Sequence, residues 1–133
     1  MTTLPKTLRA GLTGLLVATA AAPVLAGPFN RNAATDYIAD SGTIYVGDIY
    51  SYDFLGYGGR HAYVELGSAQ GRADLDVVVY DDRGEVVASG VSGFSEESLS
   101  WYVNRDTLYY IEVTSFEGTV TDFYVEAWTE GSH

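Results

Sequence analysis

Cysteine is absent from the 133 residues of this chain, and lysine occurs once, at Lys6. Without cysteine there is no disulfide framework, no thiol nucleophile and no lipid-anchored cysteine of a lipoprotein. All 18 acidic residues follow residue 26, where only five arginines oppose them. Such a surface repels phosphate backbones and anionic membranes, so neither nucleic acid nor membrane is an expected partner of the mature chain. This charge balance is typical both of proteins from salty surroundings and of ordinary soluble exported proteins.

Residues 1–26 have the three parts of a secretory signal peptide. Lys6 and Arg9 form a short basic region, an apolar run follows over residues 10–22, and Ala26 is a small residue at the expected cleavage position. The apolar run is shorter than the ~20 residues that a transmembrane helix needs. We therefore expect a secreted or periplasmic protein, with an uncleaved N-terminal anchor as the alternative.

The residues after the signal peptide predict a single all-β domain. Apolar and polar side chains alternate with a period of two, which places one set on the core and the other on solvent. The pattern predicts eight short strands, over residues 43–46, 49–55, 60–66, 74–80, 85–89, 98–103, 107–115 and 122–129. Strands of this spacing are typical of an antiparallel, jelly-roll-like β-sandwich, which we expect over residues 42–130. Residues 27–41 show no sustained period and are expected to form an N-terminal arm or linker.

The clearest predicted element is a hairpin over residues 74–89, in which a turn ending at Gly84 joins two alternating runs. Gly84 supplies the positive φ that a short turn with a bulge requires. The apolar residues of the first run are expected in the core, and Asp74 and Asp76 on the solvent face.

Four segments also match a known family. They are, in chain order, GDIYSYDF at residues 47–54, DLDVVVY at 74–80, LYYIEV at 108–113 and FYVEA at 123–127. In this order they look like the GD.D.Y.F opening, the DLDLYLY strand, the GTYYIRV strand and the closing Y.L.V of that family. Over residues 42–128 the chain thus resembles the bacterial pre-peptidase C-terminal domain, a β-sandwich module attached to many secreted peptidases.

The resemblance implies a β-sandwich with a supporting role beside a secreted peptidase, and some relatives bind calcium. Two departures matter. We expect no peptidase domain before the module, since residues 1–26 have the pattern of a signal peptide, and Thr107-Leu108 stands where the family usually has Gly-Thr. A role beside a peptidase would therefore require a partner on a separate chain.

Catalysis is not expected from these residues. A nucleophilic triad needs a base beside the nucleophile. His61 and a serine such as Ser51 are a possible pair, but no sequence feature marks the serine as a strained, exposed nucleophile. The glycine loop at residues 56–59 lacks a following helix and a lysine, so it does not predict a phosphate site. Paired carboxylates serve glycoside hydrolysis, but a sandwich of this size offers little cleft.

Calcium is the cofactor that the acidic residues suggest, because it takes six to eight oxygen ligands from carboxylates and loop carbonyls. Asp74 and Asp76 share one strand face, and the acids of the following turn lie ~23 Å further along the strand. A site must therefore combine one of these groups with another segment, for which Asp48 and Asp53 are the candidates. The alternative is a solvated acidic face with aspartates that stabilise a turn.

A second candidate site is the set of aromatic residues on the outward positions of the predicted strands. If they align across strands, they form a flat platform for stacking on sugar rings or gripping a protein. The candidates are Tyr63, Tyr80, Tyr102, Tyr110, Tyr124 and Trp128. The alternative is that these residues only stabilise the sheets by cross-strand pairing.

The sequence thus favours an exported, non-catalytic binding module that recognises an extracellular or periplasmic protein or polysaccharide, with calcium as a possible stabiliser. The alternative function is an accessory or chaperone-like domain for a separately encoded secreted peptidase or other hydrolase. A small structural or inhibitor protein of the cell envelope is a third hypothesis.

Overall fold

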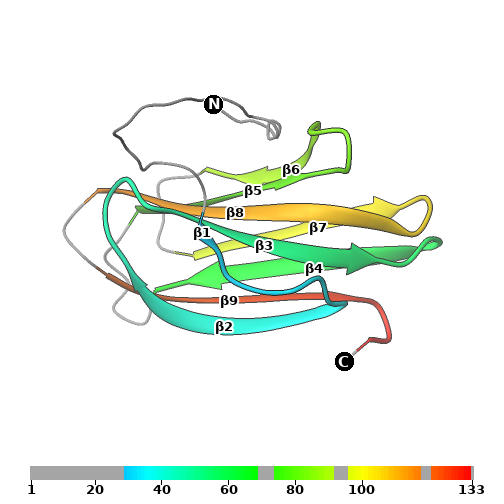
Figure 1. Cartoon of the computed structure of the whole chain (residues 1–133), viewed down its shortest axis with the longest axis horizontal. Coiled ribbons are helices and arrows are strands. Elements are labelled where there is room, and N and C mark those ends of the chain that lie inside the picture. Colours follow the sequence, from blue (N-terminus) through cyan, green and yellow to red (C-terminus); the bar gives the residue numbers. More distant parts are fainter. Residues whose placement is uncertain (1–28, 69–73, 92–95, 118–120, 133) are drawn as a thin grey trace.

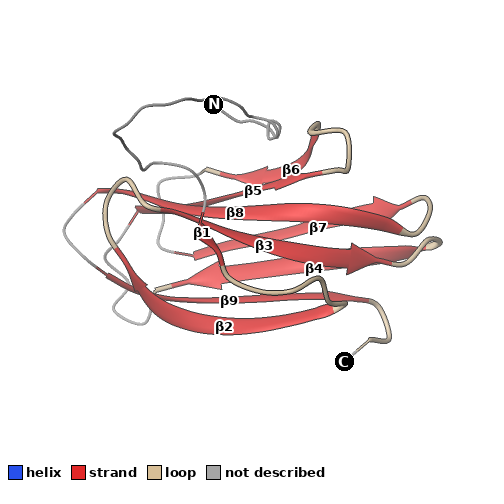
Figure 2. Cartoon of the chain, in the orientation of Figure 1, coloured by secondary structure: helices blue, strands red, loops and turns tan. Residues whose placement is uncertain are grey.

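The computed structural model describes residues 29–68, 74–91, 96–117 and 121–132 (Figure 1). The predicted signal peptide lies outside the described residues. The part of the chain that the structure describes contains strands and loops but no helix (Figure 2). None of its elements is therefore a helix that could cross a membrane.

Two sheets form the described structure. The first has the strand order β1-β3-β8-β5-β6, and the second has the order β2-β9-β4-β7. Their bounds are β1 Phe29–Asn30, β2 Tyr37–Ile44, β3 Ile49–Gly56, β4 Arg60–Gly67, β5 Asp74–Tyr80, β6 Val86–Gly90, β7 Glu96–Val103, β8 Thr107–Glu117 and β9 Thr121–Thr129. Every pairing between these strands is antiparallel except that of β1 with β3. This architecture confirms the predicted antiparallel β-sandwich.

The core lies between the two sheets and is built from the predicted alternation. Leu75, Val77 and Val79 of β5 are fully buried, whereas Asp74 and Asp76 are partly exposed on the other face of the strand. The largest buried side chains come from both sheets, and they are Tyr52, Phe54, Phe123, Ile44, Leu66, Leu75 and Ile111. Full burial of one such apolar side chain contributes about 1.5–3 kcal/mol, so the core holds the sheets face to face.

The hairpin between β5 and β6 has the predicted turn. Gly84 has a φ of 82°, and the register shifts near the end of β5, as a bulged hairpin requires. The carboxylate of Asp81 accepts hydrogen bonds from the backbone N–H groups of Arg83 and Glu85, at 2.9 and 3.0 Å. Asp81 therefore stabilises the turn itself.

The N-terminal segment differs from the prediction. The sequence predicts an arm or linker over residues 27–41, but the structure places β1 and the first part of β2 there. The described residues therefore contain nine strands, not eight. β2 pairs with β9 along its whole length. Its inward positions are Ile38, Asp40, Gly42 and Ile44, of which only the two isoleucines are apolar and buried. Asp40 and Gly42 interrupt the apolar alternation from which a strand would be predicted.

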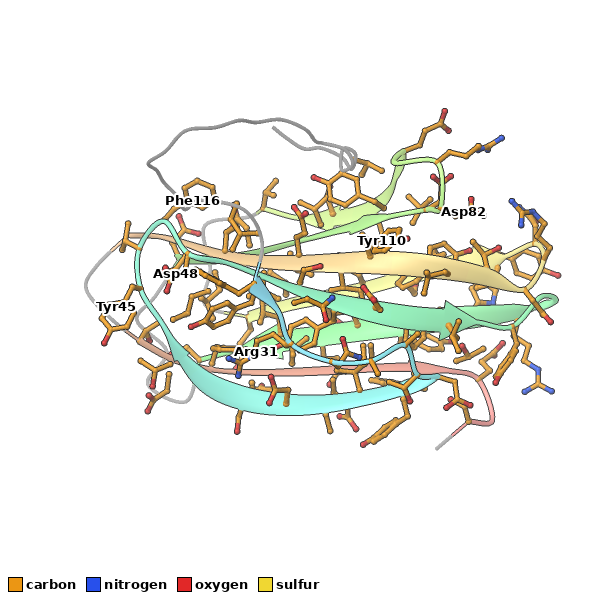
Figure 3. All side chains as sticks on the ribbon, viewed as in Figure 1. Arg31, Tyr45, Asp48, Asp82, Tyr110 and Phe116 are labelled. Atoms are coloured by element: carbon orange, nitrogen blue, oxygen red, sulfur yellow. The ribbon has the colours of Figure 1, made fainter. Side chains whose placement is uncertain are left out.

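A hydrogen-bonded cluster explains why Asp40 and Gly42 occupy inward positions. Oδ2 of Asp40 accepts hydrogen bonds from Nε of Arg31 at 3.0 Å and from the hydroxyl of Tyr52 at 2.8 Å. A Cβ on Gly42 would lie only 3.0 Å from a guanidinium nitrogen of Arg31, so glycine leaves room for that side chain. The guanidinium of Arg31, a residue labelled in Figure 3, also lies 4.6 Å from the ring centroid of Tyr50. The cluster joins β2 of the second sheet to β3 of the first at one side of the sandwich.

The same contacts set the pKa of Asp40. Partial burial acts to raise it, but the hydrogen bonds from Tyr52 and Arg31 outweigh burial and hold the pKa of this carboxyl below its usual value. A carboxyl with a lowered pKa stabilises the folded state above its unfolded pKa, and this contribution is lost as the pH falls through the folded pKa.

We therefore expect Asp40→Asn to lower the free energy of unfolding by about 1 kcal/mol at pH 7, a modest loss because the side chain is 33% exposed. Urea denaturation at pH 7 and near pH 3 measures the change, and the difference between the two proteins should shrink at the lower pH. Asp82→Asn is the control, since the contact of Asp82 with Arg105, at 3.4 Å, is an ion pair on the surface. Equal losses from both substitutions at pH 7 would contradict this account.

Candidate functional site

The structure divides the predicted aromatic platform between two faces. Tyr80 of β5 is the cross-strand partner of Tyr110 of β8, which is labelled in Figure 3. Both lie on the outer face of the first sheet. Tyr102, Tyr124 and Trp128 lie on the outer face of the second sheet. The core separates the two groups, so the five residues do not form one surface. Sequence alternation identifies outward residues but not the sheet to which each strand belongs.

The second sheet gathers the larger group of rings. Tyr37 of β2 lies opposite Trp128 of β9, which lies opposite Tyr63 of β4. The rings of Tyr63 and Trp128 stack with their centroids 5.4 Å apart. His61 of β4 packs edge-on against its partner Tyr102 of β7 at 5.3 Å. These five residues, Tyr37, His61, Tyr63, Tyr102 and Trp128, are called the aromatic patch below.

Tyr37 and His61 belong to the patch although the sequence analysis did not select them. Tyr37 is the first residue of β2, whose alternation is masked by the inward Asp40 and Gly42. His61 is visible in sequence as an outward neighbour of Tyr63, but only the pairing of β4 with β7 places it against Tyr102.

Tyr124 lies outside the patch and has a packing role. It is the cross-strand partner of Gly67, and its ring fills the space where a Cβ on Gly67 would stand, 2.6 Å away. An aromatic ring that covers a glycine in a neighbouring strand compensates for the missing side chain. The ring is also 43% exposed, so a binding role for Tyr124 stays a prediction.

Carboxylates lie beside the aromatic patch on the same face. Glu65 of β4 and Glu126 of β9 are direct cross-strand partners, and like charges in this position weaken a sheet. The hydroxyl of Tyr37 donates a hydrogen bond to Oε2 of Glu126 at 2.6 Å, and this bond raises the pKa of Tyr37. The outer face of the second sheet is thus both aromatic and acidic.

The predicted calcium ligands do not come together. Asp76 of β5 pairs with Thr114 of β8, and Asp53 of β3 pairs with Tyr110 of β8. Thr114 and Tyr110 are four residues apart, so Asp76 and Asp53 are separated by about 13 Å along the strand direction. Oδ1 of Asp53 instead accepts a hydrogen bond from Asn30 at 3.1 Å.

Asp48 lies in the turn between β2 and β3, where its Oδ2 accepts the backbone N–H of Tyr45 at 3.0 Å (Figure 3). Across the described ranges, no group of three or more histidine, aspartate or glutamate side chains is placed to hold a metal ion. Calcium binding therefore stays a prediction. Thermal unfolding with added calcium and with a chelator tests it: a higher Tm in calcium would support it, and identical curves would contradict it.

Asp74 and Asp76 are the two predicted ligands that do lie together. The Oδ1 atoms of both are buried and have no hydrogen-bond partner among the described residues. Burial, then the charge of Asp74, then that of Glu97 raise the pKa of Asp76. A carboxyl with a raised pKa favours the folded state when protonated, and this contribution is lost as the pH rises through the folded pKa.

We therefore expect Asp76→Asn to increase the free energy of unfolding at pH 7 by about 0.5 kcal/mol, because it removes a partly buried charge and its repulsion from Asp74 and Glu97. The gain should shrink as the pH falls through the raised pKa of this carboxyl, and it should be absent near pH 3, below the ordinary pKa of an aspartate. Urea denaturation at both pH values measures it. Asp81→Asn is the comparison and should destabilise the protein, since Asp81 accepts two backbone N–H groups. A loss of stability from Asp76→Asn at pH 7 would contradict the argument.

The structure does not assemble the one nucleophile–base pair considered from sequence. Ser51 lies on β3 of the first sheet and is 5% exposed, whereas His61 lies on β4 of the second. His61 packs against Tyr102, and its Nδ1 lies 3.8 Å from a carboxylate oxygen of Glu130. Ser51 and His61 therefore do not form a triad.

Comparison with known proteins identifies the fold. No protein-family model matches the chain, and no curated protein matches it in sequence. Among solved structures, the chain is similar to the pre-peptidase C-terminal domain of a collagenase from Bacillus anthracis, with a TM-score of 0.57 and 12% identity over 76% of this chain and 96% of that one. The predicted resemblance to the pre-peptidase C-terminal domain is thus confirmed at the level of fold.

A second solved structure with a similar fold is PliG of Aeromonas hydrophila, a periplasmic lysozyme inhibitor of g-type lysozyme. The TM-score is 0.52 and the identity 14%, over 70% of this chain and 83% of that one. At these identities the similarity concerns the fold and does not extend to individual site residues.

Proposed function

We propose that this protein is an exported, non-catalytic module that binds an extracellular or periplasmic protein through the aromatic patch on its second sheet. The observation that carries the proposal is the alignment of Tyr37, Trp128 and Tyr63 across three neighbouring strands. The signal peptide predicted from residues 1–26 supplies the route out of the cytoplasm.

The physical character of the patch supports a protein-binding role. Tyrosine and tryptophan offer large contact areas at little cost in side-chain entropy, and they are enriched in protein interfaces. The stacked rings of Tyr63 and Trp128 hold each other in place, while Tyr102 is 53% exposed at the edge of the patch. A sheet face with fixed rings is therefore a preorganised surface, which reduces the entropy lost on binding.

The similarity of fold supports the same class of function. PliG, a periplasmic protein of similar fold, is an inhibitor of g-type lysozyme. For the present chain we propose only the broader activity, which is recognition of a protein outside the cytoplasm.

A second candidate function is suggested by the other solved structure. The pre-peptidase C-terminal domain belongs to a collagenase, so an accessory role for a separately encoded secreted hydrolase is the alternative. The identity of the captured partner distinguishes the two hypotheses, because the accessory role requires a hydrolase.

The test is capture of partners from the secreted and periplasmic fractions of the producing cell. We expect Trp128→Ala to reduce retention of a specific partner, and to weaken its affinity about 10- to 30-fold in a reconstituted complex, because a central tryptophan of an interface contributes about 2 kcal/mol. Mass spectrometry identifies the partner, and calorimetry measures the affinity.

Tyr80→Ala is the matched control, since it removes a partly exposed ring from the outer face of the first sheet. This variant should retain the partner with unchanged affinity. Equal binding by Trp128→Ala and the native protein would remove the patch from the proposal. Failure of the native protein to bind any protein would contradict the proposed function as a whole.

A further inference from the structure

Charge on the second sheet indicates the chemistry of the partner. Among the outward positions of β4, β7 and β9 are four carboxylates, those of Glu65, Glu96, Asp122 and Glu126. The four strands of this sheet lie wholly within the described residues, and they contain no lysine and one arginine. That arginine, Arg60, stands at the start of β4 and donates a hydrogen bond to the backbone carbonyl of Glu130 at 3.0 Å. The carboxylates of this face are therefore not neutralised by cations of their own sheet.

The pairing of Glu65 with Glu126 is the most informative part of this arrangement. Directly opposed residues of an antiparallel pair have their Cβ atoms only about 4.5–5.5 Å apart, and like charges there are unfavourable. Some carboxylates elsewhere do have a cation beside them, as Asp40 has Arg31 and Asp82 has Arg105. A cationic side chain from outside would turn the unfavourable pair into a favourable contact.

The aromatic patch lies next to these carboxylates and attracts the same kind of group. Glu65 and Glu126 each stand two residues from a ring of the stacked pair, Tyr63 and Trp128, on the same face of the same strand. The guanidinium of arginine stacks on aromatic faces and binds carboxylates through its fork of N–H groups. One arginine can therefore contact a ring and a carboxylate of this surface together.

From these observations we infer that the outer face of the second sheet docks a basic polypeptide surface, with its arginine and lysine side chains over Tyr63 and Trp128 and against Glu65 and Glu126. This inference rests on the proposed function and names the chemistry of the partner. A neutral polysaccharide fits less well. The C–H faces of its sugar rings can stack on the aromatic rings, but they do not neutralise the like charges of Glu65 and Glu126.

The test uses a fluorescently labelled nona-arginine peptide and the double variant Glu65→Gln/Glu126→Gln. Glutamine keeps the size of the side chain and the acceptor for the Tyr37 hydroxyl but removes both charges. The affinity for the peptide, measured by fluorescence anisotropy, should fall about tenfold, since two exposed ion pairs each contribute up to about 1 kcal/mol. Trp128→Ala should also weaken binding of the peptide.

A matched control separates a site from general charge attraction. Asp82→Asn/Glu85→Gln removes two exposed carboxylates from the β5–β6 turn and changes the net charge by the same amount. This control should weaken binding of the peptide less than about twofold. Equal weakening by both double variants, or no binding of the peptide by the native protein, would overturn the inference.

The stability of the charge variant provides a second readout. Without peptide, Glu65→Gln/Glu126→Gln should unfold at the same or a higher temperature than the native protein, because the repulsion across β4 and β9 is gone. A loss of binding therefore cannot be attributed to unfolding. A lower Tm would contradict the unfavourable pairing on which the inference depends.

Two further outcomes separate this inference from the proposed function. If Trp128→Ala abolishes capture of a protein partner and Glu65→Gln/Glu126→Gln leaves it unchanged, the aromatic patch binds a partner that is not basic, and only the inference fails. The other outcome is that a neutral hexasaccharide binds the native protein more tightly than Trp128→Ala, while the nona-arginine peptide binds these two proteins equally. In that case the face recognises sugars, and both the inference and the proposed function fail.

Discussion

Burial of one side of every long strand between two sheets is the constraint on which the rest of this structure depends. It fixes the register of each strand, because a shift by one residue would move the whole apolar set out of the core. It also determines which aromatic residues become neighbours on the outside. Tyr63 and Trp128 stack because Val64 and Ala127, one residue away on their strands, are paired and buried in the core. The candidate binding surface is thus a consequence of the core packing beneath it.

A stable core allows the outer faces to carry unfavourable features. The opposed Glu65 and Glu126 and the closely spaced Asp74 and Asp76 each cost some stability. Only a small fraction of the total can be lost in this way, since domains of this size are stable by about 5–15 kcal/mol. Glu65 and Glu126 lie beside the aromatic patch, and we infer that cationic side chains of a partner bind there and relieve this repulsion.

Much of the fold can be predicted from this sequence, because alternation directly reports which side chains are buried. The inward residues of β5, β8 and β9 are those that the pattern indicates. β2 could not be predicted in this way, since Asp40 and Gly42 face inward to accommodate Arg31, a residue from a preceding segment. The candidate site was predicted in part. Tyr102 and Trp128 were identified as outward rings. Their separation from Tyr80 and Tyr110 depends on which strands share a sheet, and alternation within one strand does not reveal its neighbours in the sheet.

The most direct measurement is an NMR titration of the native protein with the nona-arginine peptide and then with the captured partner. Trp128 is partly exposed on the outer face, whereas Trp101 is 7% exposed in the core, so their indole N–H signals report on the two environments separately. The account predicts that the largest shifts occur at Trp128, Tyr63 and the backbone of Glu65 and Glu126. Shifts centred instead on Tyr80 and Tyr110, or spread evenly over all acidic residues, would contradict it.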